Sequence, residues 1–256
     1  MDAIALIFTG LAIGLIIGLS GVGGGSLMTP ILMFGFRVPP HIAVGTDLLF
    51  AALTKGGGVM ALARRGDVPW RAVGWLSVGS LPAAALTLAA LHALGPASDA
   101  VHHTMRTLLG LALLLTAAAT LHKAWRVQHP QTQTPMPDRH PLWAVSFGAV
   151  IGCLVTITSV GAGAIGVTVL LLLFPQLPLP RIVAADIAYA VPLTLLAGLG
   201  HAALGSVDWA LLGWLLCGSL PGIWLGGRLI HHTPVRWVRT TLSVLLLGAG
   251  VKLVGF

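Results

Sequence analysis

The chain has 256 residues, of which 56% are hydrophobic and only 8% are charged. Soluble domains carry about 25% charged residues, so this composition excludes a soluble globular protein and indicates an integral membrane protein. The formal net charge of +7 comes without a basic cluster interleaved with aromatic residues. It therefore does not indicate nucleic-acid binding, and we expect contact with the lipid bilayer instead.

Ten apolar segments are expected in chain order, and all are predicted to be helices because alternating barrel strands are absent from the sequence. The first half has segments at about 3–19, 23–36, 41–63, 70–93 and 104–122, and the second at about 141–157, 161–176, 182–203, 208–229 and 236–255. The second segment of each half is short. Fourteen helical residues reach only about 21 Å, less than the ~30 Å hydrocarbon core, which predicts half-helices or tightly tilted spans.

The two halves repeat one another. Residues 66–82 read GDVPWRAVGWLSVGSLP and residues 205–221 read GSVDWALLGWLLCGSLP, with ten of seventeen positions identical at a constant offset of 139. Duplicated membrane units with broken helices are typical of transporters, whose substrate binds between the units. We therefore expect a first membrane repeat over residues 1–125, a cytoplasmic linker over 126–140 and a second membrane repeat over 141–256.

The distribution of arginine predicts that the two repeats are inverted. The loop after the third segment contains arginine in the first repeat and none in the second. The loop after the fourth segment contains none in the first repeat, whereas arginines flank it in the second. The arginines are Arg64, Arg65 and Arg71 in the first repeat and Arg228, Arg236 and Arg239 in the second. By the positive-inside rule the linker is cytoplasmic and both termini lie outside. Five crossings per repeat satisfy this inversion, and so do three crossings with a re-entrant hairpin formed by the first two segments.

A glycine-rich junction separates the first two segments of each repeat. Clustered glycines expose backbone amides, and the helix that follows carries partial positive charge at its N-terminus, which suits an oxyanion. We interpret the junctions as a cradle for an anionic substrate, with a tight turn between packed helices as the alternative. The residues predicted to bind substrate here are Ser20, Gly21, Gly23, Gly24, Gly25 and Ser26 in the first junction and Thr158, Ser159, Gly161 and Gly163 in the second.

Three charged residues fall well inside apolar segments, away from the segment ends. The chain has no Glu, and Asp47 and Asp186 lie in spans, again 139 positions apart; Lys55 is the one Lys or Arg clearly inside a span. Ionisable residues in a bilayer are costly and mark a pathway or a buried partner. We predict that Lys55 and Thr46 contact the anionic substrate and that the two aspartates are candidates for proton coupling. The alternative is that each aspartate braces a neighbouring segment by accepting glycine-loop amides.

The sequence contains no arrangement typical of catalysis. The histidine pairs at 102–103 and 231–232 lack the spacing of a zinc site, and no nucleophile–base pair or ATP-binding motif is present. The sequence therefore predicts that the protein is not an enzyme and holds no metal or cofactor. Any driving force for transport is expected to come from an ion gradient or from the gradient of the substrate itself.

Three features together resemble a known family. They are the stretch GVGGGSLMTP at 21–30, the Gly-Thr-Asp at 45–47, and the loop RRGDVPW at 64–70 that leads to GSLP at 79–82. This combination resembles the TauE/SafE sulfite exporter family, also called the toluene-sulfonate uptake permease family, over nearly the whole chain. The resemblance implies a transporter of sulfite, sulfonates or related organosulfur anions. The second junction keeps fewer glycines than the first, which leaves the first as the stronger site.

We therefore expect an all-α polytopic protein of the inner membrane, built of two inverted repeats, that acts as a secondary transporter of a small anion. Proton coupling and uniport both stay open. The alternative is an anion channel or facilitator without ion coupling, which would keep its flux when both aspartates are substituted. A third hypothesis, a membrane protein for assembly or sensing without flux, is disfavoured by the repeated polar breaks in the helices.

Overall fold

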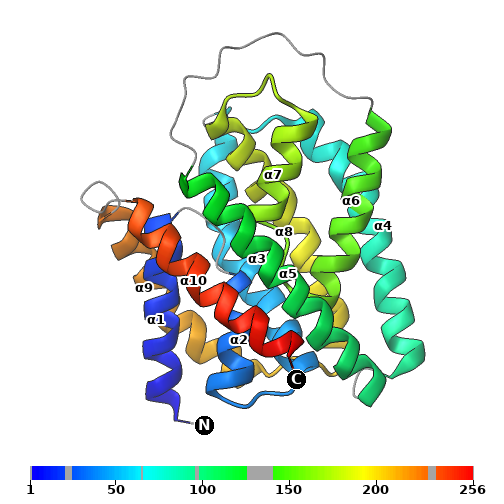
Figure 1. The fold of residues 1–256 in the computed structure, drawn as a ribbon, viewed down its shortest axis with the longest axis vertical. Coiled ribbons are helices and arrows are strands. Elements are labelled where there is room, and N and C mark those ends of the chain that lie inside the picture. The colour runs from blue at the N-terminus through cyan, green and yellow to red at the C-terminus, as the bar shows by residue number, and fades with distance from the viewer. Residues whose placement is uncertain are drawn as a thin grey trace.

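The computed structural model describes residues 2–20, 25–64, 66–95, 98–125, 141–229 and 235–255. Within these ranges the chain forms ten helices and no strand, arranged as one bundle (Figure 1). The helices are α1 (Ala3–Ser20), α2 (Gly25–Gly35), α3 (Pro40–Arg64), α4 (Trp70–Leu94), α5 (Asp99–Trp125), α6 (Pro141–Thr158), α7 (Ala164–Leu173), α8 (Leu179–Ala203), α9 (Trp209–Leu229) and α10 (Val235–Val254).

Helix lengths agree with a multi-pass membrane protein. Among the described residues, α4, α5, α6, α8 and α9 are long and apolar enough to cross a membrane. The short second segment of each half is also confirmed: α2 has 11 residues and α7 has 10. At ~1.5 Å per residue these helices reach only about 16 Å and 15 Å, well short of the ~30 Å hydrocarbon core.

The largest difference from the expected boundaries is the start of α5, which begins at Asp99, five residues before the expected apolar segment. The hydroxyl of Ser98 accepts a hydrogen bond from the backbone N–H of Val101 at 3.4 Å, as an N-cap does. The acidic Asp99 then lies in the first turn, where the helix dipole favours negative charge. Hydropathy misses this turn because Asp99 and the two histidines at 102 and 103 interrupt its apolar residues, although all of them are helical.

The two halves of the chain pack into each other rather than side by side. Helix α1 packs against α9, α4 against α6, α3 against α8, and α5 against α10. Glycines allow two of these approaches: a Cβ on Gly10 would overlap the carbonyl oxygen of Leu215, and a Cβ on Gly148 would overlap that of Leu76. Leu76 and Leu215 are 139 positions apart, so the same contact occurs twice with the halves exchanged.

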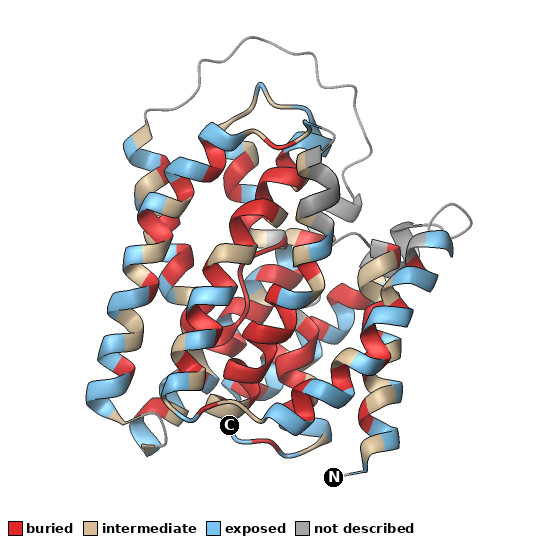
Figure 2. Cartoon of the chain, turned by 180° about the vertical axis from the view of Figure 1, so that it is seen from behind, coloured by how far each residue is buried: buried red, intermediate tan, exposed pale blue. Residues whose placement is uncertain are grey.

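Burial is concentrated in the centre of the bundle, where α3 and α8 lie against each other (Figure 2). The outer helices instead expose large apolar side chains, such as Leu86 on α4, Leu115 on α5 and Val150 on α6. An apolar outer surface fits contact with lipid chains. Polar side chains that are buried between the central helices are therefore the place to look for a functional site.

Candidate functional site

A group of buried polar side chains lies where α2, α3, α8 and the loop between α6 and α7 meet. Each member is at most 7% exposed. We call this group the central polar cluster; its members are Thr29, Asp47, Lys55, Ser159, Asp186 and Tyr189. Ionisable groups at such depth cost free energy unless they are paired or functional, so this cluster is the candidate site of the molecule.

Asp47 lies on α3 and faces α2. Its Oδ2 accepts a hydrogen bond of 2.5 Å from the hydroxyl of Thr29, and its Oδ1 has no hydrogen-bond partner among the described residues. The hydroxyl of Ser159, from the loop after α6, lies beside this carboxyl and interacts with it. Since buried polar atoms are nearly always hydrogen-bonded, Oδ1 of Asp47 can receive a proton, a water molecule or a bound ligand.

Lys55 lies two turns further along α3. Its Nζ donates a hydrogen bond of 3.3 Å to the carbonyl oxygen of Ala162, in the junction between α6 and α7. The ammonium also interacts electrostatically with Asp47 and with Asp186. An ammonium has three donors, so Lys55 can hold its backbone contact and still bind an anion. This lysine therefore connects the first half of the chain to the glycine junction of the second.

Asp186, on α8, reaches the N-terminus of α7. The backbone N–H of Gly163, the residue before α7, donates a hydrogen bond of 3.2 Å to its Oδ1. Gly163 has a φ of 139°, a region that favours glycine. A Cβ on Gly166 in the first turn of α7 would overlap the same Oδ1. The second junction thus holds a carboxylate where the sequence predicted an oxyanion, and that carboxylate belongs to the protein itself.

This contact corresponds to the alternative in which an aspartate braces a neighbouring segment by accepting a glycine-loop amide. It also agrees with the chemistry expected of the junction, because a negatively charged oxygen lies at a helix N-terminus. Gly161, with a φ of 134°, lies in the same turn. The amide of Gly163 is therefore accessible to a substrate only when the Asp186 carboxylate moves away from it.

The first junction cannot be assessed in the same way. Gly21, Gly23 and Gly24 lie outside the described residues. Ser20 ends α1, and Gly25 and Ser26 open α2, but side chains at these three positions are not described. The prediction that these six residues bind substrate stays a prediction.

Two predicted site residues point elsewhere. The hydroxyl of Thr46 accepts a hydrogen bond of 3.1 Å from the backbone N–H of Asp208, before α9. The hydroxyl of Thr158 donates to the carbonyl oxygen of Leu154 at 2.6 Å and accepts from the backbone N–H of Val160 at 3.1 Å. Thr46 holds the backbone before α9 and Thr158 holds the backbone around its own helix end, and neither hydroxyl is brought into the central polar cluster.

Comparison with known proteins identifies the family. The model of the family described as "Sulfite exporter TauE/SafE" matches residues 6–253. The chain belongs to the TauE/SafE sulfite exporter family. The central polar cluster is thus the buried polar site of a TauE/SafE protein.

Relatives from two bacteria support this assignment. The chain is similar to "Probable membrane transporter protein YjnA" of Bacillus subtilis, with 32% identity over 98% of this chain and 100% of the relative. It is also similar to YdhB of the same organism, a protein named in the same way, with 25% identity over 94% of this chain and 96% of the relative. A probable membrane transporter protein of Xylella fastidiosa is 28% identical over 87% of this chain and 83% of its own length. No solved structure matches the chain significantly.

In this TauE/SafE protein, two members of the cluster were missed by the reasoning from sequence. Thr29 is a polar residue in a short apolar helix, and this feature of the sequence could have identified it as a candidate site residue. Tyr189 lies three residues after Asp186, on the same face of α8, and its hydroxyl is buried without a partner among the described residues. Its counterpart at the offset of 139 is Phe50, so the repeat alone did not indicate a polar group here.

Proposed function

We propose that the protein is a secondary transporter of a small oxyanion, either sulfite, a sulfonate or a related organosulfur anion, and that the central polar cluster is its substrate and coupling site. Membership of the TauE/SafE family and the names of its relatives support transport as the activity. The observation that carries the proposal for the site is Lys55, a buried cation within electrostatic range of two carboxyl groups from opposite halves of the chain.

The balance of charge in the cluster supports coupling to protons. One ammonium compensates one negative charge, whereas Asp47 and Asp186 together offer two. An anion that binds beside Lys55 adds a further negative charge in a region of low dielectric, where an uncompensated charge costs several kcal/mol. The arrangement is electrically favourable when a proton enters with the anion and neutralises a carboxyl group.

The hydrogen bond between Gly163 and Asp186 suggests how the two events are linked. Protonation removes the negative charge of Asp186 and weakens its bond to the N–H at the start of α7. The freed amide and the ammonium of Lys55, which already contacts the adjacent Ala162, then face the same space. A sulfonate-like group has three equivalent oxygens and can accept from both donors. In this mechanism the substrate takes the place of the Asp186 carboxylate.

An inverted arrangement of the two repeats is part of the proposal. Figure 1 draws both termini at one end of the bundle: α1 runs away from this end, and α6 begins at the opposite end. The exchange of contacts between halves also supports a two-fold relation. Gly14 faces the carbonyl oxygen of Ser219, and Gly152 faces that of Ser80, and the two serines are 139 positions apart. Inverted repeats around a central site provide a route to alternating access.

Uptake into proteoliposomes tests this function. The wild-type protein is given radiolabelled sulfite, sulfate, sulfonates and thiosulfate in turn, with and without an imposed proton gradient. We expect one class of sulfur oxyanion to accumulate and the gradient to increase its uptake. The variant with both Asp47→Asn and Asp186→Asn should lose the response to the gradient. A variant that keeps full flux would instead identify a channel or facilitator, and no uptake of any anion by folded wild-type protein would refute transport.

A further inference from the structure

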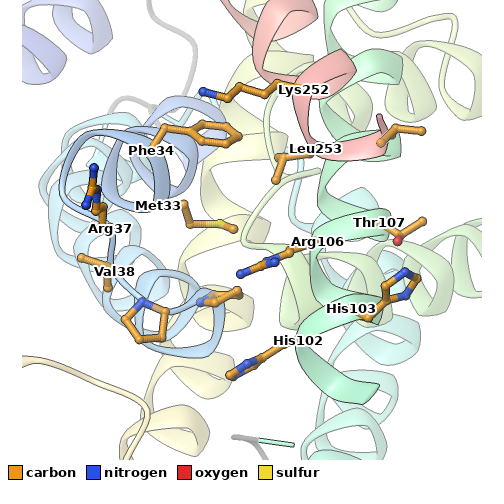
Figure 3. A pocket seen from close by; sticks show the side chains of 13 residues that line it. Met33, Phe34, Arg37, Val38, His102, His103, Arg106, Thr107, Lys252 and Leu253 are labelled. Carbon is orange, nitrogen blue, oxygen red and sulfur yellow. The ribbon is translucent and has the colours of Figure 1, made fainter. Parts of the chain in front are cut away.

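A second charged site lies between the end of α2, the loop that leads into α3, the start of α5 and the end of α10. It is a pocket of about 580 Å³. Five basic side chains line it, namely Arg37, His102, His103, Arg106 and Lys252 (Figure 3). No Asp or Glu is among the described residues that line this pocket. It shares no residue with the cluster around Lys55.

The gathering of cations is unusual for this end of the molecule. Among the described residues, the helix ends and connections on the side of both termini contain three Lys or Arg residues, namely Arg37, Arg106 and Lys252. Arg64, Arg71 and Arg228 instead belong to helix ends on the opposite side of the bundle. All three cations of the sparsely charged end thus face one pocket, where their mutual repulsion is relieved by a bound anion.

The side chains around the pocket are also tied to one another. His41 Nδ1 and His102 Nε2 are 2.7 Å apart, so an imidazole hydrogen bond joins α3 to α5 at the edge of the pocket. The ammonium of Lys252 lies 4.6 Å from the ring centre of Phe34, which joins α10 to α2. In Figure 3 the side chains of Arg106 and Lys252 approach the pocket from α5 and α10. These two contacts therefore connect the helices that border the pocket in two pairs, α3 with α5 and α10 with α2.

Apart from Thr107, the remaining lining is apolar. Met33, Phe34, Val38 and Leu253 contribute to the wall beside the basic groups. A volume of about 580 Å³ is within the range of sites for organic ligands, roughly 300–1,000 Å³. An inorganic oxyanion would leave most of this space and the whole apolar wall without a partner. The lining matches a ligand that has a charged head and an apolar body.

We propose that this pocket is a second anion site, which binds an oxyanion head group of the phosphate or sulfonate type attached to an apolar body. Arg106 and Lys252 bind the head through charge-assisted hydrogen bonds, and the apolar wall contacts the body. A soluble organic anion and the headgroup of an anionic phospholipid share this chemistry. The proposal does not depend on transport, because it concerns binding at equilibrium.

The test uses purified full-length protein in nanodiscs of phosphatidylcholine, which carries no net charge. Isothermal titration calorimetry measures binding of hexanesulfonate and of methanesulfonate, and native mass spectrometry counts phosphatidylglycerol molecules retained after its addition to the nanodiscs. The test variant combines Arg106→Gln with Lys252→Gln. The matched control combines Arg71→Gln with Arg181→Gln, which removes two exposed cations from the opposite end. Lys55→Met removes the cation of the central polar cluster and leaves the pocket intact.

We expect the test variant to bind its ligand at least tenfold more weakly than the wild type, and the control variant to bind it as the wild type does. Lys55→Met should keep the binding that the test variant loses. If the occupant is a free anion, hexanesulfonate loses affinity and binds the wild type more tightly than methanesulfonate, by about fourfold per buried methylene. If the occupant is a lipid, the retained phosphatidylglycerol is lost instead. Equal binding of both probes by the test and control variants would overturn the proposal. Binding lost only in Lys55→Met would assign the anion to the central site and also overturn it.

Discussion

Replacing Gly166 by alanine perturbs the contact between Asp186 and the start of α7 without replacing a charged residue. A Cβ at this position would overlap Oδ1 of Asp186, the atom that accepts the hydrogen bond from Gly163. The carboxylate must move, and the charge-assisted hydrogen bond is lost. Such a bond contributes about 1.5–3 kcal/mol. Alanine in a helix gains about 0.8–1.0 kcal/mol over glycine, so the net destabilisation is about 0.5–2 kcal/mol.

The assay is thermal unfolding in nanodiscs, followed through tryptophan fluorescence. A loss of this size lowers the midpoint by roughly 2–4 °C per kcal/mol. Gly74→Ala and Gly213→Ala are matched controls, because a Cβ at either position meets nothing within 4 Å. The controls should be as stable as the wild type or more stable, since only the helix propensity changes.

Combining Gly166→Ala with Asp186→Ala tests whether the destabilisation comes from the overlap between the new Cβ and the Asp186 carboxylate. Once the carboxylate is absent, alanine at 166 should no longer destabilise, so the two changes should be strongly non-additive. If Gly166→Ala raises the midpoint as the controls do, Asp186 does not occupy the start of α7, and the proposed exchange between carboxylate and substrate is refuted.

Three further substitutions test individual side chains. Lys55→Met should weaken anion uptake more than Lys55→Arg, because arginine keeps the positive charge; equal affinities from saturation curves would remove Lys55 from substrate binding. Thr46→Val should lower the midpoint of thermal unfolding by leaving the amide of Asp208 unpaired, at a cost of about 1–3 kcal/mol, while the apparent affinity for substrate stays unchanged. Tyr189→Phe should leave stability unchanged or slightly higher, because its buried hydroxyl has no partner in the described chain, but should reduce uptake if substrate uses that hydroxyl.

Much of the helical framework was predictable from sequence because hydropathy and helix length report directly on the bilayer. The ends of α4 and α9 fall within a residue of the expected boundaries, and the short α2 and α7 follow from the short apolar runs. The start of α5 was misplaced because capping by Ser98 extends the helix into polar sequence. Hydropathy measures the preference for lipid, and it does not register a turn that is stabilised by a cap.

The membership of the site was predictable only in part. Buried charge is rare in a membrane helix, so Asp47, Lys55 and Asp186 stood out without any knowledge of their surroundings. Partners were not predictable, because the bond from Thr29 to Asp47 depends on how α2 packs on α3. For the same reason Thr46, adjacent to Asp47 in sequence, bonds to the backbone before α9 instead of joining the cluster.

The repeat at the offset of 139 distinguishes residues that hold the helices together from residues of the central polar cluster. Contacts that recur at the offset of 139 hold the helices together. Examples are the carbonyl oxygens of Leu76 and Leu215, each of which lies close to a glycine of the facing helix. Within the cluster the aspartates recur, but Lys55 has Thr194 as its counterpart and Tyr189 has Phe50. A site of perfect two-fold symmetry would present two equal charges to a single anion. In the proposed mechanism the one unrepeated cation breaks this equality and gives the anion one preferred position, beside Lys55 and the second glycine junction.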